Sequence, residues 1–141
     1  MIRLIADVIG EAIEATGNPD DFVGHVGGDD FVALTTPDCA HEVARYVTEH
    51  FDHRILDHYR PEDLERGYVE LENRRFQTER FPLVSVTIAL VESDRYEIDH
   101  IAALNDIVAG LKKRGKQMPG SVVVCDQRLG TIPLPRTGSD G

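Results

Sequence analysis

The pattern of apolar and polar positions predicts a helix at the start of the chain and a hairpin directly after it. Apolar residues recur at helical spacing over residues 2–13, and Gly17 ends this pattern. Two apolar runs, 22–26 and 31–35, then flank the four residues Gly-Gly-Asp-Asp. Glycine and aspartate between two apolar runs are a hairpin signal, so two antiparallel strands are expected here.

Further helical and strand patterns follow. Residues 36–38, Thr-Pro-Asp, are typical of a helix start, and the spacing after them predicts a helix to about residue 58. The β-branched run 81–91 predicts a long, buried central strand. Asp94 and Glu97 mark the start of another helix, which Gly115 is expected to end.

Two segments stand apart from this core. Residues 59–80 are highly charged and predict a peripheral hairpin insertion, with a strand at 67–71 and a turn near 72–75. Residues 127–141 are rich in Gly, Pro and small polar side chains, which indicates a flexible C-terminal tail. The sequence therefore predicts one domain over residues 1–126.

The order of the expected elements predicts an α/β (α+β) fold related to ferredoxin-like plaits. One mostly antiparallel sheet is expected to contain residues 22–26, 31–34, 83–91 and 121–124. Helices would cover one or both faces of this sheet.

Composition narrows the classes of partner. The chain has 15 basic and 25 acidic residues and a net charge of −10, which argues against nucleic acid and against direct membrane binding. Cys39 and Cys125 lack metal-ligand spacing, and neither a signal peptide nor a spanning segment is recognisable. These features predict a cytoplasmic protein.

The hairpin turn is the strongest candidate for chemistry. Gly27 and Gly28 allow a close approach of the backbone to an anion, and Asp29 and Asp30 can hold a hard divalent cation. The alternative interpretation is an ordinary hairpin turn, for which the same residue types are common.

Three segments together resemble the GGDEF domain of diguanylate cyclases. Residues 27–31, Gly-Gly-Asp-Asp-Phe, resemble the signature itself. Residues 85–89 resemble the family's serine-isoleucine-glycine strand, with Ala89 in place of glycine. Residues 111–117 resemble its alanine-lysine, glycine-arginine-asparagine stretch. The resemblance spans about residues 2–124 and implies a role in bacterial cyclic di-GMP signalling.

The resemblance also implies roles for residues. Asp29 and Asp30 would be catalytic and would coordinate Mg²⁺ or Mn²⁺, while Gly27 and Gly28 would contact GTP. Lys112 and Lys116 would hold its triphosphate, and Lys116 replaces the family's arginine. The reaction is attack of one GTP 3′-hydroxyl on the α-phosphate of another, which forms cyclic di-GMP and requires an antiparallel dimer.

Several family features are missing from the given sequence. The family's first strand and the segment after it carry a further metal ligand and the groups that read guanine, and neither precedes Met1. The isolated chain is therefore predicted to be inactive or very weakly active. The product-inhibition site is degenerate as well, because Asn18 stands where the family has arginine, although Asp21 is retained.

Other functions stay open. The main alternative is a non-catalytic regulatory module that binds a protein partner or a nucleotide such as GTP or cyclic di-GMP. A homodimer, a partner chain or an upstream sensory domain is expected to cover the sheet edge that the absent strand leaves. His50, His53 and His58 could suggest a metal module, but solvated helix histidines are the favoured interpretation. Cys39 is interpreted as an inert small residue.

Overall fold

The computed structural model of the protein describes residues 1–93 and 101–125. The described elements, in chain order, are α1 (Ile2–Thr16), β1 (Phe22–Gly27), β2 (Asp30–Leu34), α2 (Pro37–Ile55), the 3₁₀ turn η1 (Leu56–His58), α3 (Pro61–Arg66), β3 (Tyr68–Glu72), β4 (Thr78–Pro82), β5 (Thr87–Leu90), α4 (Ile101–Lys116) and β6 (Val122–Cys125). The first helix, the first hairpin, the second helix and the last strand thus confirm the sequence predictions. The predicted helix start at Asp94 and the predicted tail lie outside the described residues.

The strands of this mixed α/β fold form three sheets of two strands each. β1 pairs with β2 and β3 pairs with β4, both antiparallel, whereas β5 and β6 are parallel. The prediction of one mostly antiparallel sheet is therefore wrong for the described residues. The parallel pair has a physical cause, because α4 connects the end of β5 with the start of β6, and such a crossover returns the chain in the same direction.

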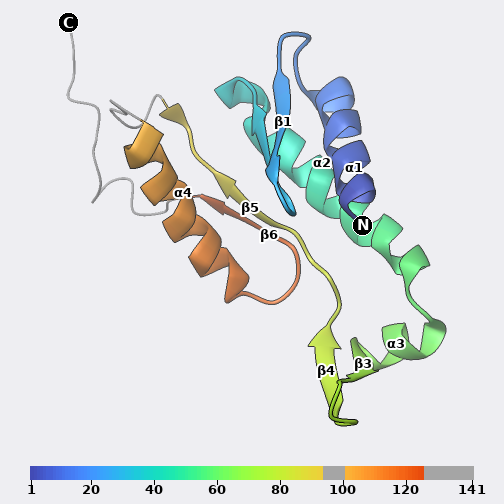
Figure 1. Ribbon diagram of the computed structural model, residues 1–141. Coiled ribbons are helices and arrows are strands. Elements are labelled where there is room, and N and C mark those ends of the chain that lie inside the picture. Colours follow the sequence, from blue (N-terminus) through green and yellow to red (C-terminus); the bar gives the residue numbers. More distant parts are fainter. Residues whose placement is uncertain (94–100, 126–141) are drawn as a thin grey trace, which may run out of the picture.

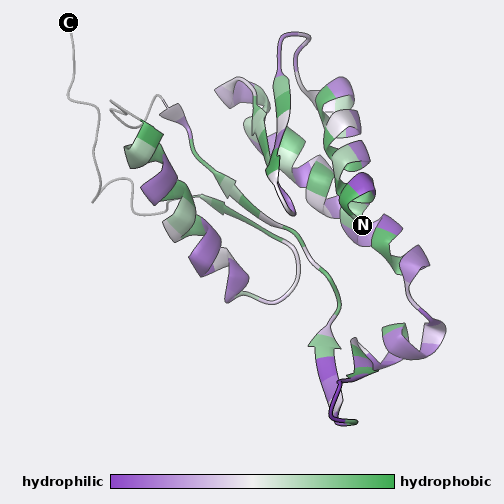
Figure 2. Ribbon diagram, viewed as in Figure 1, coloured by the Kyte–Doolittle hydropathy of each residue, from purple (hydrophilic) through white to green (hydrophobic). Residues whose placement is uncertain are grey.

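The helices bury most of the core. α1 and α2 pack against each other through Val8, Ala12, Val47 and Phe51, all at most 4% exposed. Figure 1 shows β5 and β6 between α2 and α4, and both helices contact both strands. Figure 2 shows that these two strands are largely hydrophobic. A layer of helix therefore covers each face of the β5–β6 pair.

The predicted long strand over 81–91 is wrong in extent. Phe81 and Pro82 belong to β4 and pair with β3, and the next strand, β5, begins only at Thr87. Between β4 and β5, two backbone N–H groups are hydrogen-bonded to side chains. The N–H of Val84 donates to Tyr59 Oη at 2.7 Å, and the N–H of Val86 donates to Ser121 Oγ at 2.9 Å. These N–H groups therefore make no ladder bond, and β5 is only partly buried.

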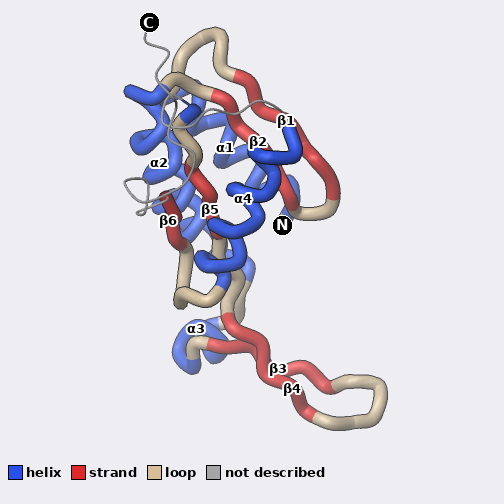
Figure 3. The backbone as a smooth tube through the Cα atoms, turned by 90° about the vertical axis from the view of Figure 1, so that its left-hand side faces the viewer, coloured by secondary structure: helices blue, strands red, loops and turns tan. Residues whose placement is uncertain are grey.

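The charged segment 59–82 differs in part from its prediction. It contains the predicted hairpin, β3 and β4, but also the short helix α3, which the sequence analysis did not predict. Figure 3 shows that this segment, named here the arm, extends away from the remaining elements. In the described part of the chain, no helix is long and apolar enough to cross a membrane.

Candidate functional site

The Gly-Gly-Asp-Asp turn joins β1 to β2. Gly27 and Gly28 both have positive φ, +154° and +55°, so the turn needs residues without a Cβ at these positions. His25 stacks on Phe31 with ring centroids 4.5 Å apart, and its Nε2 donates to the carbonyl oxygen of Gly28 at 2.8 Å. The hairpin therefore holds both glycines and the following carboxylates in a defined geometry.

A lysine from α4 reaches this turn. Lys112 Nζ donates to Asp30 Oδ1 at 2.6 Å, and the two side chains are 30% and 52% exposed. The hydrogen bond and charge of Lys112 lower the pKa of Asp30, against the effect of burial, and the charge of Lys116 acts in the same direction. The structure thus brings two lysines of α4 close enough to Asp30 for both to act on its charge, Lys112 by direct contact and Lys116 at longer range. Asp29, the neighbour of Asp30 in the turn, is exposed.

The position of α4 depends on close packing against β5 and β6. A Cβ placed on Gly115 would lie 2.5 Å from Thr87 Cγ2 and 2.8 Å from Val124 Cγ2. The helix ends at Lys116, one residue beyond the predicted end at Gly115, and Gly115 in its last turn lets the backbone approach the strands. Arg114 Nη2 also donates to the carbonyl oxygen of Cys125 at 3.0 Å, which ties the helix to β6.

The turn fits a metal ion only in part. Asp29 and Asp30 offer two adjacent carboxylates, but Lys112 already pairs with Asp30. The described residues contain no group of three or more His, Cys, Asp or Glu that could hold a metal ion. A resident metal is thus poorly accommodated, and a cation at this turn would need ligands from a bound molecule, such as phosphate oxygens.

Comparison with known proteins gives no further guidance. No family model, curated protein or solved structure matches this chain. The assignment of the site therefore depends on its residues and on the motifs that they resemble.

Asn18 and Asp21, the expected remnant of a product site, join three elements. Asp21 Oδ2 accepts hydrogen bonds of 2.7 Å from the backbone N–H of Asn18 and from Thr35 Oγ1, and Asn18 Nδ2 donates to Thr36 Oγ1 at 2.8 Å. Burial raises the pKa of Asp21, but the hydrogen bonds from Asn18 and Thr35 outweigh it, so the net pKa is lowered. These residues connect the end of α1 to the end of β2 and the start of α2.

The remaining candidates are engaged in local packing. His50 stacks on Tyr46, with ring centroids 3.7 Å apart. Cys39 packs against the α1–α2 core, and its Sγ lies 3.5 Å from Asn18 Nδ2. Cys39 is thus a half-buried packing residue, and His50, expected as a solvated helix histidine, is half-buried against Tyr46.

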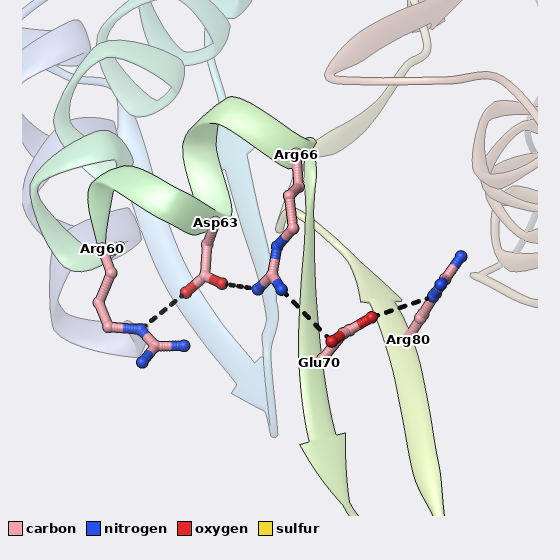
Figure 4. Close-up of polar contacts among 5 residues, drawn as sticks. All are labelled: Arg60, Asp63, Arg66, Glu70 and Arg80. Atoms are coloured by element: carbon pink, nitrogen blue, oxygen red, sulfur yellow. Dashed lines mark hydrogen bonds and ion pairs between the residues drawn. The ribbon is translucent and has the colours of Figure 1, made fainter.

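The sequence analysis missed a charge network in the arm. Asp63, 4% exposed, accepts from both Arg60 and Arg66, and Glu70 then links Arg66 to Arg80 with contacts of 3.3 and 3.2 Å (Figure 4). The hydrogen bond from Arg60 lowers the pKa of Asp63 most, against burial, and Arg66 adds to the effect. The three- and four-residue spacings of Asp63, Arg66 and Glu70 were the available signal.

Proposed function

We propose that this chain is a GGDEF-like domain of bacterial cyclic di-GMP signalling, derived from diguanylate cyclases and impaired in catalysis. The contact between Lys112 and Asp30 carries the proposal, because it joins two motif segments 82 residues apart in the sequence. An ordinary hairpin turn gives no reason for a lysine of the second motif to reach the aspartate of the first.

The proposed ligand is a nucleoside triphosphate bound with Mg²⁺ or Mn²⁺. Gly27 and Gly28 leave the backbone open to phosphate oxygens, and Lys112 and Lys116 supply positive charge from α4. A phosphate group would replace Asp30 as the partner of Lys112. Asp30 would then be free, with Asp29, to contact the cation that arrives with the nucleotide.

Impaired catalysis follows from the incomplete set of groups. In this proposal the assigned residues would contact phosphate and offer two carboxylates to a metal ion, whereas the resemblance assigns no residue to recognition of guanine. We therefore propose weak, metal-dependent binding with little preference for the base. Cyclic di-GMP synthesis, which needs two facing copies of a complete site, would be absent or very slow.

A non-catalytic regulatory module is the second candidate. The ion pair between Lys112 and Asp30 favours it, because a carboxylate already neutralised by lysine is a poorer metal ligand. In this case the turn would bind a nucleotide or a protein partner, and no product would form.

Calorimetric titration tests the proposal. Mg-GTP and Mg-ATP are titrated separately into the wild-type chain, into Lys112→Ala and into Lys113→Ala, a control that removes an exposed charge from the same helix. Lys112→Ala is expected to weaken binding by about 10- to 100-fold, the loss of one charge-assisted contact, whereas Lys113→Ala is expected to leave it nearly unchanged. Asp29→Ala is expected to remove the dependence on Mg²⁺.

Four results would contradict parts of the proposal. No binding to the wild-type chain, or equal losses in both lysine variants, would remove the assigned phosphate site. A strong preference for GTP would reveal a guanine pocket outside the assigned residues. Formation of cyclic di-GMP would show that catalysis is intact.

A further inference from the structure

The arm has one polar and one largely apolar face. The register of β3 and β4 places Tyr68, Glu70 and Arg80 on one face, where the guanidinium groups of Arg66 and Arg80 lie 5.2 and 4.8 Å from the Tyr68 ring. On the opposite face lie Val69, Leu71 and Phe81 together with Glu79, and Leu71 and Phe81 are 56% and 43% exposed. The network of Figure 4 therefore stabilises a hairpin on whose opposite face Leu71 and Phe81 are exposed in the described structure.

The tip of the arm presents an aromatic ring to solvent. Phe76 is 85% exposed and has φ of +60°, a conformation that a bulky side chain rarely adopts. Asn73 fixes the turn, because its Oδ1 accepts from the N–H groups of Arg75 and Gln77 at 2.8 and 3.0 Å. Exposure and strain together are unfavourable in the isolated chain, and both are typical of a residue that anchors an interface.

A second exposed apolar surface lies on the β1–β2 hairpin. Phe22, Val32 and Leu34 share the face opposite Phe31, which packs on the core, and they are 55%, 39% and 59% exposed. Exposed carboxylates border this surface, with Asp20 just before β1 and Asp29 in the turn. We name this surface the hairpin face.

The two surfaces complement each other in charge. Arg74 and Arg75 directly precede Phe76 at the tip, and no ion pair to either side chain occurs among the described residues. The turn 73–77 carries both arginines and the exposed ring and no acidic residue, while Glu72 and Glu79 lie on the adjoining strands. The two arginines match the aspartates that border the hairpin face. Figures 1 and 3 show the arm and the hairpin at opposite ends of the molecule, so one chain cannot join them.

We propose that the arm of one copy docks on the hairpin face of a second copy. Phe76 inserts among Phe22, Val32 and Leu34, while Arg74 and Arg75 lie near the bordering aspartates. The reciprocal contact from the second copy closes a two-fold dimer with two identical contacts. This docking is a separate proposal from nucleotide binding, but it places the second copy beside the Gly-Gly-Asp-Asp turn, where Asp29 belongs to both surfaces.

Sedimentation velocity over a dilution series tests the proposal with three variants. Phe76→Gly removes the anchor and suits a positive φ, so the fold is expected to keep its thermal stability while the dimer dissociation constant rises at least about tenfold. Leu34→Asp is expected to weaken the dimer similarly from the other surface. Met118→Ala, a truncation of a side chain that is 45% exposed elsewhere, is the control and is expected to change nothing.

Mixing the two defective variants distinguishes docking from a general loss of dimerisation. One contact in the mixed dimer joins a wild-type arm to a wild-type hairpin face, so the mixture is expected to dimerise more tightly than either variant alone. In addition, p-benzoylphenylalanine at position 76 is expected to form a photo-cross-link to a peptide within residues 22–34 of the other copy.

The results that overturn the proposal are equally specific. They are a wild-type chain that stays monomeric at every concentration, a dimer that neither Phe76→Gly nor Leu34→Asp weakens, a mixture no tighter than its components, or a cross-link that maps to any other region.

Discussion

Gly115→Ala tests the packing that places α4 beside the hairpin turn. The added methyl group would lie 2.5 Å from Thr87 Cγ2 and 2.8 Å from Val124 Cγ2, and both of these β-branched side chains have little rotamer freedom. Overpacking of this kind costs about 1–3 kcal/mol, and the better helix propensity of alanine offsets about 1 kcal/mol. The expected net loss is therefore about 0–2 kcal/mol of the free energy of unfolding.

A matched control lies on the same helix. Gly110 is exposed, and a Cβ there would meet nothing within 4 Å, so Gly110→Ala is expected to stabilise the protein by about 0.5–1 kcal/mol. Because both variants gain the same helix propensity, they should differ by the overpacking cost of about 1–3 kcal/mol in urea unfolding. If Gly115→Ala is as stable as Gly110→Ala, then α4 does not pack on β5 and β6 through this glycine.

Three further predictions concern the core and the carboxylates. Phe51→Ala, at a site 2% exposed between α1 and α2, is expected to cost about 3–5 kcal/mol in urea unfolding, and a loss below 1 kcal/mol would contradict the assigned core. The pKa of Asp21 is lowered on folding, so its contribution to stability is complete above its unfolded pKa of about 3.9 and is lost as pH falls through the lower folded pKa. Asp21→Asn should therefore reduce the loss of stability between pH 5 and acid, and an unchanged pH profile would refute this. Lys112→Met is expected to raise the pKa of Asp30, as followed by carboxyl ¹³C NMR, and an unmoved titration curve would exclude the ion pair in solution.

The sequence predicted those elements whose signals are local. Helical spacing identified α1 and α2, and the glycines between two apolar runs identified the hairpin, because these patterns determine backbone geometry directly. The short β5 could not be predicted in this way. Tyr59 and Ser121, 25 and 35 residues from the donors that they bind, capture the N–H groups of Val84 and Val86.

The candidate site was predicted only in part, because sequence motifs can name its residues but not the contacts between them. The motif resemblance named Asp30 and Lys112 from separate segments, and their 2.6 Å contact depends on tertiary packing that no local pattern contains. The packing role of Gly115 was misassigned, because a glycine near a helix end is a common stop signal. The buried Asp63 was not predicted either, since α3 has only six residues and therefore too few for a periodic pattern.

Amide NMR during titration with Mg-GTP tests the proposed triphosphate site most directly. Gly67 and Gly120 are internal controls, because they also have positive φ but lie outside the assigned site. We expect concentration-dependent shifts of the Gly27 and Gly28 amide signals, without comparable shifts at Gly67 and Gly120, and loss of the response in Lys112→Ala. Unmoved Gly27 and Gly28 signals at millimolar nucleotide, or equal shifts at all four glycines, would contradict it.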